Sequence, residues 1–249
     1  MNIQLANVQR NGRADNSRPR IQFCGHWLNE LGFVTGALVQ SIPEPNGFSF
    51  KLCNENIGSY SELFRVTREK GGTLIRVYLV QERTREGPGF VTTGHHIYKA
   101  GLKIGDALVA KTEAGLIRVR KVPENMRLIP VAREKHPRTG EPKPRAFLLG
   151  NWLNDIGFTP DTLTTVATAP DCITIKAHME PVVYSDIVRF ARLNKMKLIQ
   201  VSTKDGAPLI VVSGSCAEKA GFALGDIFCA KMEQGIIKLQ KLDPVECGF

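Results

Sequence analysis

The pattern of apolar and polar positions predicts one short structural unit, which occurs four times along the chain. In the first copy, residues 21–23 read as a short strand, and residues 25–31 as a helical turn whose apolar side chains share one face. Gly32 is typical of the left-handed residue that ends a helix. Residues 38–42 and 48–52 then predict a hairpin, because the intervening Pro-Glu-Pro-Asn-Gly sequence favours a turn. Each unit is therefore expected to contain a strand, a helical turn and a hairpin.

Glycine spacing marks the four copies. The units open at Gly25, Gly94, Gly150 and Gly214, and each has a second glycine seven residues later. A unit of about 40 residues is too small to bury a core alone. We therefore expect the units to pair, with two units contributing to each core.

The chain also repeats at the scale of a half-chain. Residues 19–52 align without a gap to residues 144–177, with 11 identities in 34 positions. Residues 91–122 align in the same way to residues 211–242, with 13 identities in 32 positions. This pattern indicates an internal duplication.

Between the units of each half, a helix followed by a strand is expected. Apolar residues recur at helical spacing at Tyr60, Leu63 and Phe64, and again at Tyr184, Ile187 and Val188. Strands are predicted to follow at residues 73–80 and 197–201.

These observations divide the chain into four parts. They are a basic flexible N-terminus at residues 1–18, a first lobe at 19–123, a basic Pro-rich linker at 124–143 and a second lobe at 144–249. The expected fold is mainly β with short helices, in the α+β class. Trp27 and Trp152 are expected to be equivalent, buried residues that anchor the short helices.

The repeated pattern resembles a known family. The sequence from Gly25 through Trp27, Leu28 and Gly32 to Gly36, found again from Gly150 to Phe158, is similar to the signature of the SymE toxin family. That resemblance implies the AbrB-like swapped-hairpin fold, in which two chains interleave hairpins into one barrel and commonly bind DNA. Here it implies two tandem pseudo-dimeric barrels within one chain, each with a helix-strand insert.

Charge is uneven along the chain. The net charge of +9 divides into +7 for residues 1–123, +2 for 124–143 and zero for 144–249. A basic surface suggests contact with a polyanion. Two pairs stand out: Arg65 and Arg68, spaced to share one helix face, and Arg118 and Arg120, spaced to share one side of a strand. The expected nucleic-acid-binding residues are Arg20, Arg65, Arg68, Lys99, Arg118, Arg120, Arg133, Arg138 and Arg145. Solvated surface charge is the alternative interpretation.

Other chemistry is sparse. The six cysteines have no paired metal-ligand spacing and read as free thiols, while His95 and His96 lack a partner at metal-ligand spacing. We expect no catalytic residue, no metal and no cofactor. No long apolar run or secretory leader is present, so a cytoplasmic protein without membrane contact is expected.

Three functions remain open from the sequence. The leading hypothesis is a non-catalytic nucleic-acid-binding protein, DNA before RNA, acting through the first lobe and linker. The second is a SymE-like RNA-cleaving toxin, implied by the resemblance alone. The third is a protein-interaction module that antagonises a nucleic-acid enzyme.

Overall fold

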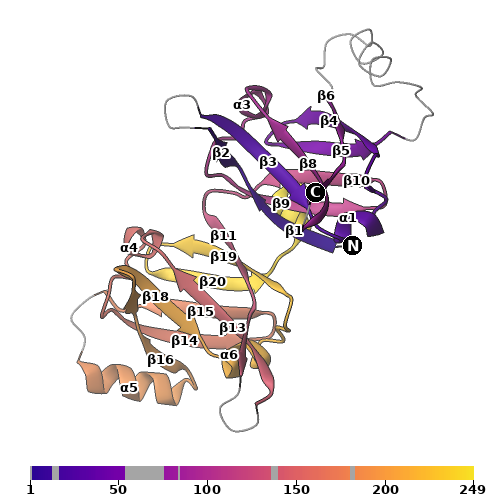
Figure 1. The fold of residues 1–249 in the computed structure, drawn as a ribbon. Helices are drawn as coiled ribbons and strands as arrows, with labels where there is room; N and C mark the ends of the chain where they lie inside the picture. Colours follow the sequence, from indigo (N-terminus) through magenta and orange to yellow (C-terminus); the bar gives the residue numbers. More distant parts are fainter. Residues whose placement is uncertain (1, 13–16, 54–75, 84, 136–139, 180–182) are drawn as a thin grey trace. The chain divides into compact units, whose positions relative to one another are not determined.

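The computed structural model describes residues 2–249 except 13–16, 54–75, 84, 136–139 and 180–182 (Figure 1). The chain divides into two compact units. Unit 1 comprises residues 1–122 together with 244–249, and unit 2 comprises residues 123–243. Both are built mainly from antiparallel strands with a few short helices, which confirms the mainly β, α+β expectation.

Unit 1 contains two sheets. The six-stranded sheet has the order β1 (Asn2–Asn7), β9 (Ala107–Glu113), β10 (Leu116–Lys121), β5 (Gly47–Leu52), β4 (Leu38–Glu44) and β6 (Arg76–Leu79). The four-stranded sheet has the order β2 (Gln9–Asn11), β3 (Arg18–Cys24), β8 (Gly87–Thr93) and β7 (Gln81–Arg83). The described helices are α1 (Trp27–Glu30), α3 (His96–Lys99) and the 3₁₀ turn η2 (Pro244–Cys247).

Unit 2 has sheets of the same sizes. The larger has the order β11 (Met126–Pro130), β19 (Ile227–Glu233), β20 (Ile236–Lys241), β15 (Cys172–Ala177), β14 (Leu163–Ala169) and β16 (Lys197–Gln200). The smaller has the order β12 (Ala132–Lys135), β13 (Pro142–Leu149), β18 (Ala207–Val212) and β17 (Ser202–Lys204). The described helices are α4 (Trp152–Asp155), α5 (Tyr184–Leu193) and α6 (Gly214–Lys219).

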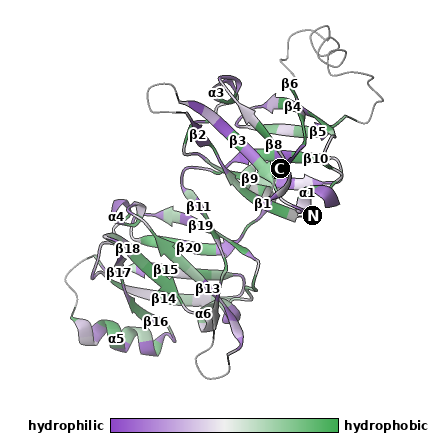
Figure 2. Ribbon diagram, in the orientation of Figure 1, coloured by the Kyte–Doolittle hydropathy of each residue, from purple (hydrophilic) through white to green (hydrophobic). Residues whose placement is uncertain are grey.

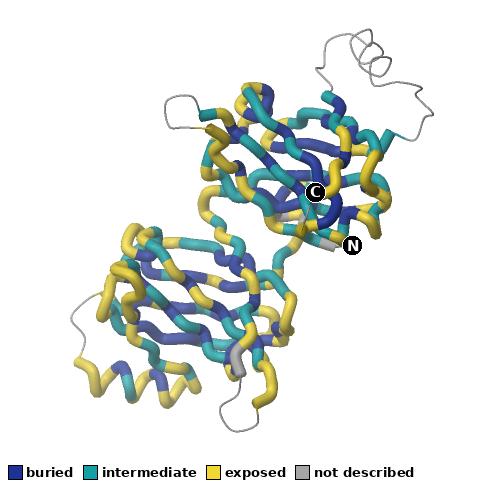
Figure 3. Tube along the Cα trace, viewed as in Figure 1, coloured by how far each residue is buried: buried dark blue, intermediate teal, exposed yellow. Residues whose placement is uncertain are grey.

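The two sheets of each unit enclose one hydrophobic core. In unit 1 the ring of Phe23, from β3, lies 5.4 Å from the ring of Phe50, from β5, and 5.4 Å from that of Phe90, from β8. All three side chains are buried, and along β3 the buried residues alternate with more exposed ones, as in a sheet with one face in the core (Figure 3). In the core of unit 2, the rings of the buried Phe222 and Phe228 lie 4.1 Å apart.

The predicted sharing of one sheet by two hairpins is confirmed, but the predicted barrel is wrong. Strand β10 pairs with β5, which joins the hairpins at residues 38–52 and 107–122 in one sheet. The sheets stay open, because the chain leaves one sheet and enters the other after a single residue. Val8 lies between β1 and β2, and Val80 lies between β6 and β7. Both side chains are buried at these corners, so pairing in the larger sheet stops there.

The predicted domain boundaries also differ from those observed. Residues 2–11, expected to be flexible, form β1 and β2, and residues 126–135, expected to be a linker, form β11 and β12. Strand β1 pairs with β9 and β11 pairs with β19, so each unit acquires an additional strand from the segment before its first predicted strand. Short strands with polar outer faces carry little periodicity, which is why the sequence pattern missed them.

The predicted helix ends are confirmed. Gly32 and Gly157 have φ values of +87° and +86°, in the left-handed region. The Phe33 N–H donates to the Leu28 carbonyl at 2.9 Å, and the Phe158 N–H donates to the Leu153 carbonyl at 2.8 Å. These bonds close each helix, and both phenylalanines are fully buried.

The prediction that Trp27 and Trp152 are buried is wrong, although the two are equivalent. Both are half-buried against the core, and each indole N–H donates to the carbonyl three residues earlier, at 3.0 Å to Cys24 and 3.1 Å to Leu149. The fully buried residue of each short helix is the next one, Leu28 or Leu153.

Of the two predicted insert helices, the first falls outside the described residues. The second is α5, on which Ile187 and Ala191 are buried as predicted, whereas Tyr184 is 66% exposed. The strand predicted to follow each helix is observed as β6 and β16. All six cysteines are free thiols, as predicted.

Candidate functional site

The basic residues singled out in the sequence lie on several surfaces. In unit 1, Arg20 is on the outer face of β3, Lys99 is exposed on α3, and Arg118 and Arg120 share the outer face of β10. In unit 2, Arg133 lies on β12 and Arg145 on β13. Arg65, Arg68 and Arg138 lie outside the described residues. Because β3 and β10 belong to different sheets around one core, Arg20 and Arg118 point in opposite directions.

Arg120 is engaged in contacts within unit 1. Its guanidinium forms an ion pair with Glu44, and it lies 5.8 Å from the centre of the Phe249 ring. Burial tends to raise the pKa of Glu44, but hydrogen bonds from Ser49 and Arg120 outweigh it and lower the pKa. Arg118 and Arg120 share one face of β10, as predicted. The Arg120 side chain, however, links β10 to the end of β4 through its ion pair with Glu44.

Three arginines lie on the outer face of the four-stranded sheet in unit 1. Arg18 and Arg20 alternate with buried residues along β3, and Arg83 of β7 pairs with Gly87, at the other end of β8 from Thr93. Pairing places Arg20 between Gln9 of β2 and Thr93 of β8. Arg20 donates to the side chain of Gln22, and Arg83 lies across Gly89, where a Cβ would be 3.1 Å from Arg83 Cδ. We call Arg18, Arg20, Arg83, Gln9, Gln22 and Thr93 the arginine face.

The sequence analysis identified only Arg20 of the three arginines. The signal for Arg18 is the alternation along β3, where exposed and half-buried positions are polar and the positions between them are buried. Arg83 carried no such signal, because β7 has only three residues.

The corresponding face of unit 2 combines apolar residues with basic ones: Lys143, Arg145 and Lys204 stand at the positions of the three arginines. Phe147 and Leu149 of β13 are each 42% exposed, and they pair with Val211 and Leu209 of β18. The guanidinium of Arg145 lies 4.6 Å from the centre of the Phe147 ring. In Figure 2, β18, which is the counterpart of β8, is coloured mostly hydrophobic.

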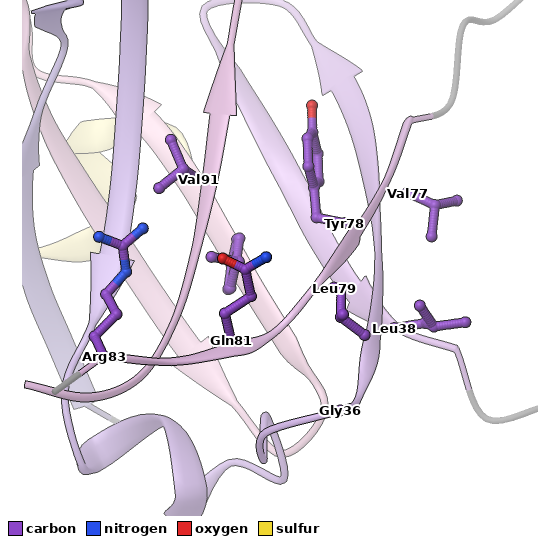
Figure 4. Close-up of a pocket in the computed structure, with 9 residues that line it drawn as sticks. Gly36, Leu38, Val77, Tyr78, Leu79, Gln81, Arg83 and Val91 are labelled. Carbon is purple, nitrogen blue, oxygen red and sulfur yellow. The ribbon is translucent and has the colours of Figure 1, made fainter. Parts of the chain in front are cut away.

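A groove borders the arginine face. Its volume is about 640 Å³, and its lining is mostly apolar, with residues from β6, β7 and β8. Figure 4 shows Gln81 and Arg83 extending from β7 near Val91 of β8. Arg83 and Val91 belong both to the groove and to the outer face of the sheet, so the two features are continuous.

A second feature of unit 1 is a group of polar side chains inside the core near α3. We call Ser41, Arg76, Tyr78, Thr92 and His96 the polar cluster. Thr92 Oγ1 lies 2.7 Å from His96 Nε2 and 2.7 Å from the Tyr78 hydroxyl. Thr92 is fully buried and His96 is 7% exposed. Burial, assisted by the nearby positive charge of Arg76, lowers the pKa of His96 to about 4, so the imidazole is neutral near pH 7.

The polar cluster was not predicted, although the repeat alignment contained a signal. Thr92 aligns with Val212, and His96 aligns with Cys216. At each of these two positions unit 1 has a polar residue and unit 2 an apolar one, and all four residues are buried. A polar residue at a position where the other repeat has an apolar core residue indicates a role in unit 1 that unit 2 lacks.

No group of three or more His, Cys, Asp or Glu side chains is placed to hold a metal within the described parts of the chain. The same residues include no helix that is long and apolar enough to cross a bilayer. Comparison of the chain with protein-family models, with curated proteins and with solved structures gives no match. The functional argument therefore depends on the residues and surfaces described above.

Proposed function

We propose that the chain is a non-catalytic nucleic-acid-binding protein, DNA ahead of RNA, and that unit 1 makes the contact through the arginine face. The observation that supports this most directly is the presence of Arg18, Arg20 and Arg83 on the outer surface of one sheet, among amide and hydroxyl side chains. Arginine binds phosphate with several N–H groups, and residues two apart on a strand are about 7 Å apart. Such a surface can contact a phosphate backbone at several points.

Net charge also favours unit 1, but the difference between the two units is smaller than the boundaries expected from the sequence had indicated. With the observed boundaries, unit 1 has 17 Lys and Arg against 11 Asp and Glu, a net charge of +6. Unit 2 has 16 against 13, a net charge of +3. The corresponding face of unit 2 also carries three basic residues, Lys143, Arg145 and Lys204. The two faces differ mainly on β13, where Phe147 and Leu149 stand at the positions of Gln22 and Cys24.

The test measures binding of the full chain to duplex DNA, single-stranded DNA and RNA across a range of salt concentrations. Substituting Gln for Arg18, Arg20 and Arg83 together should remove most of the affinity. It should also reduce the slope of log K against log salt by about 2 to 3, because each neutralised phosphate contributes close to one. The effect should be similar for all sequences.

The matched control substitutes Gln for Lys111 and Arg118, which pair on the outer face of the other sheet. This variant should bind nearly as the parent does. If the arginine-face variant binds like the parent while it remains folded, the proposal is wrong. RNA recovered in shortened form on a denaturing gel would instead support the SymE-like RNA-cleaving alternative.

The apolar residues on the corresponding face of unit 2 favour a second candidate, the protein-interaction module. Four apolar side chains share this face, and two of them are each 42% exposed: Phe147, Leu149, Leu209 and Val211, of which the first two are the exposed ones. If the chain antagonises a nucleic-acid enzyme by binding it, inhibition should not depend on the DNA concentration. Substituting Ser for Phe147 and Leu149 should abolish that inhibition and leave DNA binding unchanged.

A further inference from the structure

The polar cluster of unit 1 contains three hydrogen-bonding atoms that have no partner among the described residues. They are Ser41 Oγ, Arg76 Nε and His96 Nδ1, and all three atoms are buried. Ser41 is 1% exposed and His96 is 7% exposed. Buried polar atoms are rarely left without a partner, since each such atom costs free energy. These three atoms of one region are therefore available to a bound group.

The three atoms come from segments that the fold brings together. Ser41 of β4 and Arg76 of β6 are directly opposite in the antiparallel ladder, so their side chains are on the same face. The next pair on that face is Val39 and Tyr78, and the Tyr78 hydroxyl lies 3.4 Å from His96 Nε2. Arg76 is two residues from Tyr78 on β6 and therefore lies on the same face, next to the side chain that reaches His96.

Hydrogen-bond directions in the cluster identify the kind of group that fits. Tyr78 O–H can donate to Thr92 Oγ1, and Thr92 O–H can donate to His96 Nε2. A neutral imidazole that accepts at Nε2 carries its proton at Nδ1. In this arrangement His96 Nδ1–H, Arg76 Nε–H and Ser41 O–H are all donors. An oxyanion can accept from all three and neutralises the guanidinium, whereas a metal ion cannot.

Unit 2 differs at the corresponding positions. Strand register and the repeat alignment match Ser41, Arg76 and His96 with Val166, Lys197 and Cys216. Two of the three donors are therefore absent, and the third, Lys197 Nζ, donates to Ser213 Oγ at 2.7 Å. Val166, Lys197 and Cys216 line one pocket of about 460 Å³ together with Lys219, the counterpart of Lys99. The positions that carry the three donors in unit 1 therefore line a single pocket in unit 2.

We propose that unit 1 binds a phosphate-type oxyanion between β4, β6 and α3, held by Arg76, Ser41 and His96. Arg76 supplies the positive charge, and Ser41 and His96 supply two neutral donors. The site is separate from the arginine face, and it does not depend on the proposed function. The oxyanion is either free phosphate or the phosphate group of a nucleotide.

The experiment adds inorganic phosphate to the full chain at constant ionic strength, with sodium chloride as the reference. A Trp152→Phe variant leaves Trp27 as the only tryptophan, so fluorescence reports the melting of unit 1. Phosphate should raise the melting temperature of unit 1 saturably, because a ligand that binds only the folded state stabilises it. Isothermal titration calorimetry on the parent chain measures the affinity directly.

Ser41→Ala and Arg76→Gln test the site, and Lys197→Gln in unit 2 is the control. Ser41→Ala should weaken phosphate binding at least tenfold and should not lower the melting temperature without phosphate, because it removes a donor that has no partner. A purely structural role for Ser41 predicts the opposite result. Arg76→Gln should abolish the response, while Lys197→Gln should leave it intact.

Parallel titrations with adenosine monophosphate distinguish the two sources of the oxyanion. Equal affinity for phosphate and the nucleotide assigns the site to a free oxyanion, and tighter nucleotide binding assigns it to a nucleotide phosphate. The proposal is overturned if neither ligand gives a saturable response beyond chloride, or if Arg76→Gln responds as the parent does.

Discussion

At the scale of single residues, Gly25 shows how a spacing in the sequence becomes a steric requirement. Its φ is +129°, and a Cβ at this position would lie 2.7 Å from the Trp27 ring. The same relation occurs between Gly150, with φ at +133°, and Trp152, at 2.9 Å. The glycine is therefore needed both for its backbone conformation and because the indole lies over it. This explains why Gly-x-Trp occurs in both halves of the chain.

Gly25→Ala should consequently destabilise unit 1 more than Gly36→Ala. Both residues have positive φ, but nothing lies within 4 Å of a Cβ at Gly36. We expect a cost of about 1 kcal/mol for Gly36→Ala from the backbone alone, and roughly 2 kcal/mol or more for Gly25→Ala. Chemical denaturation of the two variants provides the comparison. Equal destabilisation would show that the contact with Trp27 has no energetic consequence.

His96 should make the stability of unit 1 depend on pH. Its pKa is lowered from 6.5 to about 4 in the folded chain, first by burial and then by Arg76. The unfolded chain therefore takes up a proton below about pH 6.5, where the folded chain does not. Stability should be highest above pH 6.5, fall as the pH drops towards 4 and level off below it, with a total loss of about 3 kcal/mol.

The measurement is the free energy of unfolding of unit 1, followed through Trp27 in the Trp152→Phe chain. His96→Cys, which introduces the residue found at the aligned position of unit 2, is the matched control. The decline attributed to His96 should be absent from that variant. An unchanged decline between pH 6.5 and 4 would assign the effect to other groups.

At the scale of elements, four valines decide where each sheet ends. Val8, Val80, Val131 and Val201 each separate a strand of the larger sheet from a strand of the smaller one, and all four are buried. Their backbone N–H groups are bonded as well: Val8 donates to the Asp106 carbonyl at 2.9 Å, and Val131 donates to the Asp226 carbonyl at 3.0 Å. A buried apolar corner turns the chain towards the core, so the two sheets face each other and do not close into a barrel.

At the scale of the whole molecule, the boundaries of the two units differ from those of the aligned repeats. The first unit includes the last residues of the chain, 244–249, and the second unit starts at residue 123. The guanidinium of Arg120, on the outer side of β10, lies 5.8 Å from the centre of the Phe249 ring, and Cys247 is buried. This places the C-terminal segment among the residues that a fragment of unit 1 would need.

Two fragments test this division. Residues 123–243 contain every described strand of unit 2 and should unfold cooperatively. Residues 144–249 lack β11 and β12, and should be much less stable because β19 and β13 each lose a neighbouring strand. Urea denaturation followed by circular dichroism gives the comparison. Two fragments of equal stability would mean that β11 and β12 contribute little to unit 2.

The sequence by itself determined the features that depend on neighbours within a few residues. The glycine at the end of α1, the hairpins around residues 43–47 and 113–115, and the shared outer side of Arg118 and Arg120 all follow from local backbone geometry. Tertiary structure decided everything that depends on distant partners. It gave Arg120 an ion pair with Glu44, and added β1 and β11 to the sheets. It also brought Ser41, Arg76 and His96 from three separate segments into one cluster, because side-chain pairing across a sheet depends on register.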